Sequence, residues 1–189
     1  MESTTEIFLR VQHGEGDNDV VSGEAQVGRY AGRMQIDSFT FGMNNPLQAP
    51  GLSENKDANK LNLDRLVVTK FFDRASTQLA ALMKRKEPLE EVRVTVDQQL
   101  IETGTDESRG SKAQNAILVF HLAGARVVDF KIGVTEEKAG ATVKETVAFT
   151  FQQVSIDYYF TSRDKKQERA GTDFRDKAVS FDSKYQPQD

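Results

Sequence analysis

Residues 147–160, with the sequence VAFTFQQVSIDYYF, decide the fold. Apolar side chains occupy odd positions as far as Phe151 and even positions from Val154 onward. Because successive side chains of a strand point to opposite faces of a sheet, this parity cannot change without an extra residue or an interruption. The stretch therefore predicts a β-bulge or a strand break near Gln152 and Gln153, where one long strand bends from one sheet toward another.

Alternation with a period of two continues along most of the chain. Its clearest case is residues 92–97, VRVTVD, with three valines on one face and three polar side chains on the other. Related patterns occur at residues 7–11, 61–63, 66–71, 117–122 and 127–132. The short connector around Gly124 predicts a hairpin between the last two of these strands. Many strands of this kind indicate an antiparallel barrel or sandwich.

One segment has the helical period instead. Residues 76–86 place Leu79, Leu82 and Met83 on one stripe, and Ser76 is the expected N-cap. The helix should end in a basic cluster that suits the negative end of the helix dipole, formed by Lys84, Arg85 and Lys86.

Three segments have the composition of loops. Residues 13–21 are acidic and rich in glycine, and residues 43–60 contain two prolines and several asparagines. Residues 161–176 carry dense charge of both signs, which is typical of a mobile or interface segment. A last short strand is predicted at residues 178–181.

The composition excludes several classes of chemistry. The 189 residues suit a single domain, and the absence of cysteine excludes disulfides, thiolate zinc sites and a cysteine nucleophile. Two histidines are too few for a multi-histidine metal site within one subunit. A net charge of −4 argues against binding nucleic acid. The first residues lack the pattern of a signal peptide, and no apolar run is long enough to span a bilayer, so we expect folding in the cytoplasm.

No motif predicts a catalytic, cofactor or metal site. Residues 17–19 lack the spacing of a calcium loop, and residues 14–16 lack the third glycine of a dinucleotide fingerprint. A structural role is favoured for His121, since no nucleophile motif accompanies it. A hairpin tip is favoured over a phosphate grip for residues 108–112. The function is therefore expected in surfaces, through self-assembly, partner binding or a scaffold.

Three motifs, in order, resemble those of the Hcp family, the inner-tube proteins of bacterial type VI secretion systems. The first is GEA at residues 23–25 with MQIDSFTFG at residues 34–42, and the second is LVVTKFFDRASTQL at residues 66–79. The third is ETVAFTF at residues 145–151, followed by IDY. The residues that carry the resemblance are Gly23, Glu24, Ser38, Phe39, Phe41, Gly42, Thr69, Lys70, Asp73, Ala75, Ser76, Leu79 and Glu145.

The resemblance implies a mainly β fold, an antiparallel β-barrel of two sheets with one short flanking α-helix at about 76–86 and an extended loop at about 43–60. It also implies a non-enzymatic subunit that forms hexameric rings, which stack into a tube that a sheath expels behind a spike. Effectors would travel in the lumen of the tube. For the chain itself we expect no nucleic-acid partner, no insertion into a membrane and no cleaved signal peptide. The candidate contacts between subunits lie in the extended loop: Met43, Asn44, Asn45, Pro46, Leu47, Pro50, Gly51 and Leu52.

The sequence departs from the family pattern at several places. Thr77 stands where the family usually has proline at the first helical position, residues 12–22 resemble an insertion, and residues 161–189 match no family ending. We therefore expect one domain over residues 1–189, with a core at about 6–160. The alternatives are a tail-tube or baseplate protein of a phage-derived contractile particle and, in another class, a β-sandwich hydrolase or carbohydrate-binding module. The absence of tryptophan for sugar stacking disfavours the last class.

Overall fold

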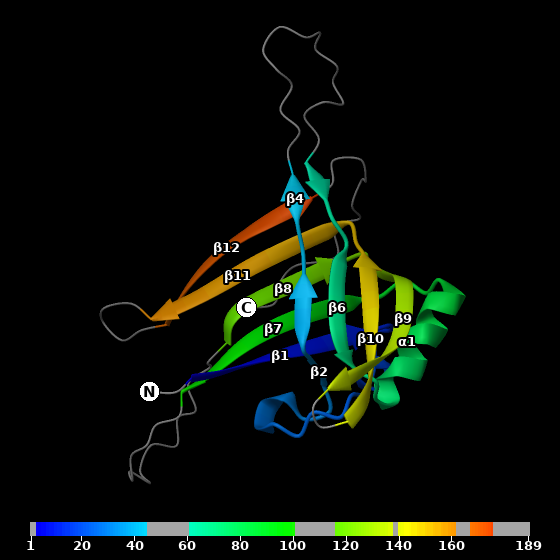
Figure 1. Cartoon of the computed structure of the whole chain (residues 1–189). Coiled ribbons are helices and arrows are strands. Elements are labelled where there is room, and N and C mark those ends of the chain that lie inside the picture. Colours follow the sequence, from blue (N-terminus) through cyan, green and yellow to red (C-terminus); the bar gives the residue numbers. More distant parts are fainter. Residues whose placement is uncertain (1–2, 45–60, 101–115, 138–139, 162–166, 176–189) are drawn as a thin grey trace, which may run out of the picture.

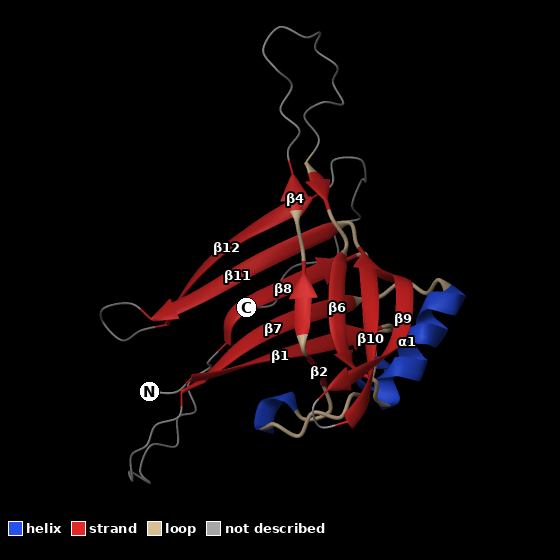
Figure 2. Ribbon diagram, viewed as in Figure 1, coloured by secondary structure: helices blue, strands red, loops and turns tan. Residues whose placement is uncertain are grey.

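The computed structural model describes residues 3–44, 61–100, 116–137, 140–161 and 167–175 (Figure 1). Two antiparallel sheets make up most of this structure, with one α-helix at their flank (Figure 2). The predicted mainly β architecture with a single short helix is therefore confirmed. Within the described residues, none of the helices is long and apolar enough to cross a membrane.

The larger sheet has six strands, in the order β12-β11-β8-β7-β1-β2. Its members are β1 (Ser3–Gln12), β2 (Met34–Ile36), β7 (Glu91–Leu100), β8 (Ala116–Ala123), β11 (Gln153–Thr161) and β12 (Gln167–Arg175). The longest pairings join β1 to β7 and β11 to β12.

The smaller sheet has four strands, in the order β3-β6-β10-β9. Its members are β3 (Ser38–Thr40), β6 (Leu66–Phe71), β9 (Arg126–Glu137) and β10 (Gly140–Thr150). A separate two-stranded ladder, β4 (Met43–Asn44) with β5 (Asn62–Leu63), extends from the end of this sheet (Figure 1).

The chain passes between the two sheets four times: once through the helix, from β6 to β7, and at three direct corners, from β2 to β3, from β8 to β9 and from β10 to β11. The last corner confirms the strand break predicted from the change of parity, since β10 ends at Thr150 and β11 begins at Gln153. There the Gln152 amide donates to the Ala123 carbonyl at 3.0 Å, which ties this corner to the neighbouring one.

The hairpin predicted around Gly124 is wrong. β8 pairs with β7 and β11, whereas β9 pairs with β10 in the other sheet, so the connector turns a corner. Gly124 has a φ of +61°, and a Cβ there would lie 2.5 Å from the side chain of Gln152. Glycine permits both this backbone conformation and the close packing of the two corners.

The core lies between the sheets and below the helix. It contains alternate residues of the central strands, among them Leu9, Val94 and Phe120 from the six-stranded sheet and Val68 and Phe149 from the four-stranded sheet. The helix contributes Leu79 and Leu82, both buried, and contacts β9. This burial of apolar side chains is the main stabilising term of the fold.

The helix α1 (Arg74–Arg85) begins earlier than expected. Its N-cap is Asp73, whose Oδ1 accepts from the Ala75 amide at 2.9 Å, so the prediction of Ser76 as N-cap is wrong. Ser76 is the third helical residue and returns a bond through its hydroxyl, which accepts from the Asp73 amide at 2.9 Å. Thr77 is therefore inside the first turn and does not occupy the first helical position.

The predicted loops have more structure than expected. The charge-dense segment was expected to be a mobile or interface loop, but its residues 167–175 form β12 and pair with β11. Residues 17–19 form a short 3-10 turn, η1 (Asp17–Asp19), and Met43 and Asn44 belong to β4. The strand predicted at residues 178–181 and the basic turn at 108–112 lie outside the described residues.

Candidate functional site

A buried lysine gathers residues from two of the three motifs. Lys70 is fully buried on the inward face of β6 (Leu66–Phe71), and its Nζ donates to the Phe71 carbonyl at 2.8 Å and to Asp73 Oδ1 at 2.7 Å. The same Nζ lies 3.4 Å from Ser76 Oγ and 3.0 Å from Oε1 of the equally buried Glu145 on β10. The cluster therefore joins the four-stranded sheet to the start of the helix.

The charges of this cluster suit a structural role. Two carboxylates surround one ammonium group, and the negative charge of Asp73 is further stabilised at the positive end of the helix dipole. A buried charge is tolerated only when it is paired and hydrogen-bonded, as Lys70 is here. Every polar partner is fixed by a strand or a cap, so the cluster sets the position of α1 against the sheet.

The first motif packs against the same region. A Cβ on Gly23 would lie 2.3 Å from the Arg33 carbonyl oxygen, so only glycine fits this close approach of two backbone segments. The next residue, Glu24, accepts from the Arg74 amide through Oε1 at 3.1 Å, which satisfies one of the free amides at the start of α1.

The aromatic residues of the first motif line the opposite end of the core. Phe39 and Phe41 both meet Phe120 edge-on, with ring centroids 5.2 and 5.8 Å apart, and Phe41 also lies 5.9 Å from Phe151. These contacts join β3 to the six-stranded sheet and to the β10–β11 corner.

The remaining motif residues hold the backbone in place. Ser38 pairs with Thr69 in the register of β3 and β6, Gly42 accepts from the Asp64 amide at 2.9 Å, and Ala75 is buried in the first turn of α1. Together the motif residues build the framework of the fold. Of the candidate subunit-contact residues, Met43 and Asn44 lie in β4, while Asn45, Pro46, Leu47, Pro50, Gly51 and Leu52 lie outside the described residues.

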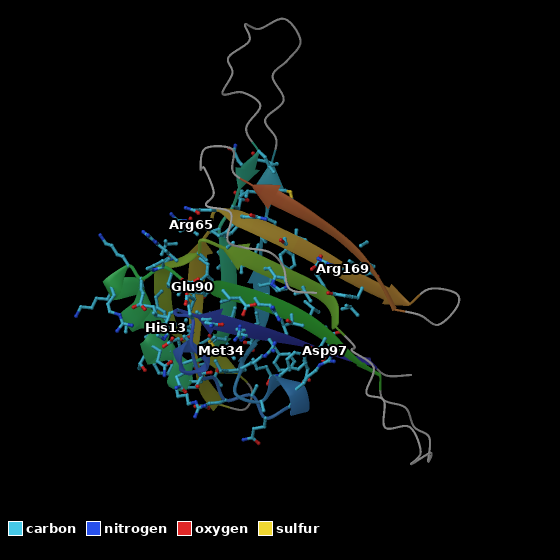
Figure 3. The ribbon with its side chains drawn as sticks, turned by 180° about the vertical axis from the view of Figure 1, so that it is seen from behind. His13, Met34, Arg65, Glu90, Asp97 and Arg169 are labelled. Carbon is cyan, nitrogen blue, oxygen red and sulfur yellow. The ribbon has the colours of Figure 1, made fainter. Side chains whose placement is uncertain are left out.

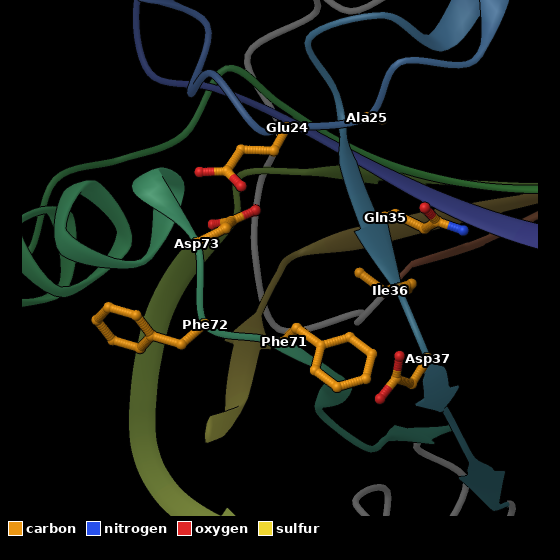
Figure 4. A pocket seen from close by; sticks show the side chains of 8 residues that line it. All are labelled: Glu24, Ala25, Gln35, Ile36, Asp37, Phe71, Phe72 and Asp73. Carbon is orange, nitrogen blue, oxygen red and sulfur yellow. The ribbon is translucent and has the colours of Figure 1, made fainter. Parts of the chain in front are cut away.

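A hollow of about 280 Å³ opens beside the start of α1, and no sequence motif predicts it. Figure 4 shows its lining of two phenylalanines, three carboxylates and the backbone of β2: Glu24, Ala25, Gln35, Ile36, Asp37, Phe71, Phe72 and Asp73. Phe71 and Phe72 are 48% and 41% exposed, which is unusual for adjacent aromatic residues. We call this hollow the aromatic notch.

The outward face of the six-stranded sheet is polar, yet much of it is buried. Arg10, Arg93, His121 and Ser155 follow one another across four strands in register. Acidic residues pair with arginines on the same face, Asp97 with Arg29 and Asp157 with Arg169, each at 2.9 Å (Figure 3). Burial, and after it the guanidinium groups of Arg93 and Arg10, lowers the pKa of Arg33.

His121 belongs to this polar face, and among the described residues no hydrogen bond joins it to the neighbouring Ser155. Its Nδ1 is 3.9 Å from Glu91 Oε1, too far for a hydrogen bond, and burial lowers its pKa to about 4, with Arg93 as the second cause. The structural reading of His121 thus fits its surroundings. The described residues contain no group of three or more histidine and acidic side chains arranged to hold a metal ion.

Comparison with known proteins identifies a family whose model spans these motif residues. Residues 8–158 match the family model described as "Type VI secretion system effector, Hcp". No protein of curated function matches the sequence.

Several solved structures share the fold at low sequence identity. A type six secretion system protein is 15% identical, with a TM-score of 0.69, and the alignment covers 91% of this chain and 96% of that one. Hcp1 from Salmonella typhimurium is 14% identical, with a TM-score of 0.61 and coverage of 94% and 99%. The secreted protein Hcp3 from Pseudomonas aeruginosa is 17% identical, with a TM-score of 0.54, and the alignment covers 88% of this chain and 97% of that one. Because the family model spans most of the sequence, the chain belongs to the Hcp family of type VI secretion system proteins.

Proposed function

We propose that this chain is the structural subunit of a type VI secretion tube and that six copies close into a ring. The observation that carries the proposal is the family match over residues 8–158, whose motif residues build the junction between helix and sheet. A tube subunit needs matched surfaces and a rigid frame. The polar side chains of that junction hold the helix rigidly against the sheet.

Exposed apolar residues support self-association. On the hairpin of β9 and β10, Ile132 and Val134 are 57% and 69% exposed, and Val134 pairs with Val143, which is 44% exposed. These side chains continue the inward face of the sheet beyond the packed core, because Ile132 pairs with the buried Glu145. Contiguous exposed apolar side chains of this kind commonly mark a protein interface.

A closed ring also requires two different contact surfaces on each copy, since identical subunits must meet head to tail. The edge strands β9 and β12 offer unpaired backbone groups on opposite sheets, and neighbouring subunits would cover them. The proposal extends to stacked rings, to contacts through the loop at residues 43–60, and to a sheath, a spike and effectors as partners. Export would take the folded protein from the cytoplasm through the secretion machine, without a cleaved signal peptide.

The size of the purified protein tests the ring. We expect light scattering to give about six times the 21.1 kDa mass of one chain, and electron micrographs to show rings. A strict monomer at high concentration, without rings on the grid, contradicts the proposal.

A phage-derived tail-tube or baseplate protein is the second candidate, since it would need the same kind of subunit. The description of the matching family favours the secretion system. Appearance of the protein in culture fluid that depends on the type VI machinery separates the two candidates.

A further inference from the structure

One half of the aromatic notch already holds a cation from the chain itself. Lys144 Nζ lies 4.7 Å from the centroid of the Phe71 ring and 3.1 Å from Asp37 Oδ2. An aromatic face beside a carboxylate is a favourable site for an ammonium or guanidinium group. This contact shows that the lining of the notch can hold an ammonium group between a ring and a carboxylate.

The other half repeats the same chemistry around Phe72. Figure 4 shows the carboxylates of Glu24 and Asp73 directed toward one another, while the Phe72 ring extends from the position before Asp73. Glu24 uses Oε1 for the Arg74 amide, which leaves its Oε2 for another donor. Within the part of the chain that the structure describes, no basic side chain lies over the Phe72 ring.

We propose that the Phe72 half of the notch binds a basic side chain from a second copy of this chain. Asp73 is already paired with Lys70, so the free oxygen of Glu24 supplies the negative charge for the incoming cation. The exposed Phe72 ring supplies the apolar contact for the stem of a lysine. The inference rests on the proposed tube function, because it assigns one of the contacts between copies.

The matching surface lies at the far end of the same helix. Lys84 and Lys86 are exposed, and neither forms an ion pair with another described residue. Arg85 is held by Glu87 at 2.8 Å, so the two lysines are the available cations of this cluster. The notch and the lysines are separated by the length of α1, about 18 Å, and such opposite placement is what a head-to-tail contact between copies requires.

A charge swap tests the contact. We expect Glu24→Lys, and separately the pair Lys84→Glu with Lys86→Glu, to weaken association between copies about tenfold in sedimentation velocity. Combining all three substitutions should restore it, because the charges are then exchanged and not lost. The matched control is Glu15→Lys, at an exposed position of the turn before η1 and outside the surfaces proposed for association, which should leave association unchanged.

Cysteine cross-linking provides a second measurement that does not depend on Glu24. The natural chain has no cysteine, so a chain with Gln35→Cys at the notch and Lys84→Cys at the helix end should oxidise to a ladder of linked copies. Chains with Gln35→Cys alone or Lys84→Cys alone should give no ladder.

The possible outcomes separate this contact from the tube function. Folded charge variants that associate normally, a swap that restores nothing, or a missing ladder each overturn the notch contact, while rings formed by the natural chain keep the proposed function. A natural chain that stays monomeric overturns both.

Discussion

Lys70 and Glu145 are the residues on which the junction of helix and sheet depends most. Both side chains are fully buried, and Lys70 Nζ lies 3.0 Å from Glu145 Oε1. Removing one partner of a buried ion pair leaves a charge without compensation, whereas replacing both with apolar side chains of similar size is much less costly. Replacing Lys70 and Glu145 one at a time should therefore lower the free energy of unfolding by more, summed over the two variants, than replacing both residues together.

We expect Glu145→Ala to lower the free energy of unfolding by about 3–5 kcal/mol. The double variant Lys70→Met with Glu145→Leu should lose less than the two single variants together. Urea denaturation at one protein concentration measures both, because association of copies adds to apparent stability. Glu15→Ala, at an exposed position outside the proposed association surfaces, is the control, and a loss below about 1 kcal/mol for Glu145→Ala would contradict the structural role.

His121 makes the stability of the fold depend on acid pH. Burial and the opposing charge of Arg93 lower its pKa from 6.5 to about 4 in the folded protein, against a smaller raising effect of Asp157. Between these two pH values the unfolded chain binds a proton that the folded chain does not. The free energy of unfolding therefore falls as the pH drops through this window, by up to about 3 kcal/mol.

Replacing His121 with glutamine should remove that part of the acid sensitivity. Unfolding curves of both proteins at pH 7 and pH 4 measure it, and the difference between the proteins cancels the titration of the carboxylates that they share. An equal loss of stability in the variant would show that His121 is protonated in the folded state.

At the scale of the elements, the sequence predicts best where burial on one face imposes a pattern. The change of parity near Gln152 located a strand break because both halves of the stretch keep one face in the core, as Phe149 and Val154 do. β12 has no such face: QERAGTDFR lacks alternation, and its pairing with β11 creates the strand. The prediction of a hairpin at Gly124 failed for a related reason. A short connector does not reveal whether the two strands that it joins pair with each other or with other strands.

The start of α1 shows a similar limit. Asp73 and Ser76 are both acceptable caps by residue type, and the choice depends on where the chain leaves β6. That exit is fixed by Lys70, whose ammonium group binds Asp73 from the preceding strand. The order of the motifs predicted these residues as a set, whereas their convergence on one buried ammonium group required the tertiary structure.

At the scale of the whole molecule, the sequence predicted a function located in surfaces, and it indicated one of them, the loop at residues 43–60. It gave no sign of the aromatic notch, which is assembled from three separate segments: Glu24 and Ala25, β2 with Asp37, and residues 71–73, which run from the end of β6 to the N-cap of α1. Phe71 and Phe72 could be recognised as adjacent aromatics, but only the fold leaves both exposed.

The loop prediction can be tested because the structure shows how its base is closed. β4 and β5 pair Met43 with Leu63 and Asn44 with Asn62, and the two asparagine side chains bond at 3.1 Å. Replacing residues 45–61 with Asn-Gly, a turn that suits a two-residue hairpin, should keep this ladder and change the free energy of unfolding by less than about 1 kcal/mol. We expect that variant to fold but not to be secreted, measured by the amount of protein in culture fluid. A variant with a Gly-Ser segment of natural length is the control that separates length from sequence. Normal secretion of the shortened chain would remove the loop from the contacts of the tube and leave the helix ends and the β9–β10 hairpin as its candidate surfaces.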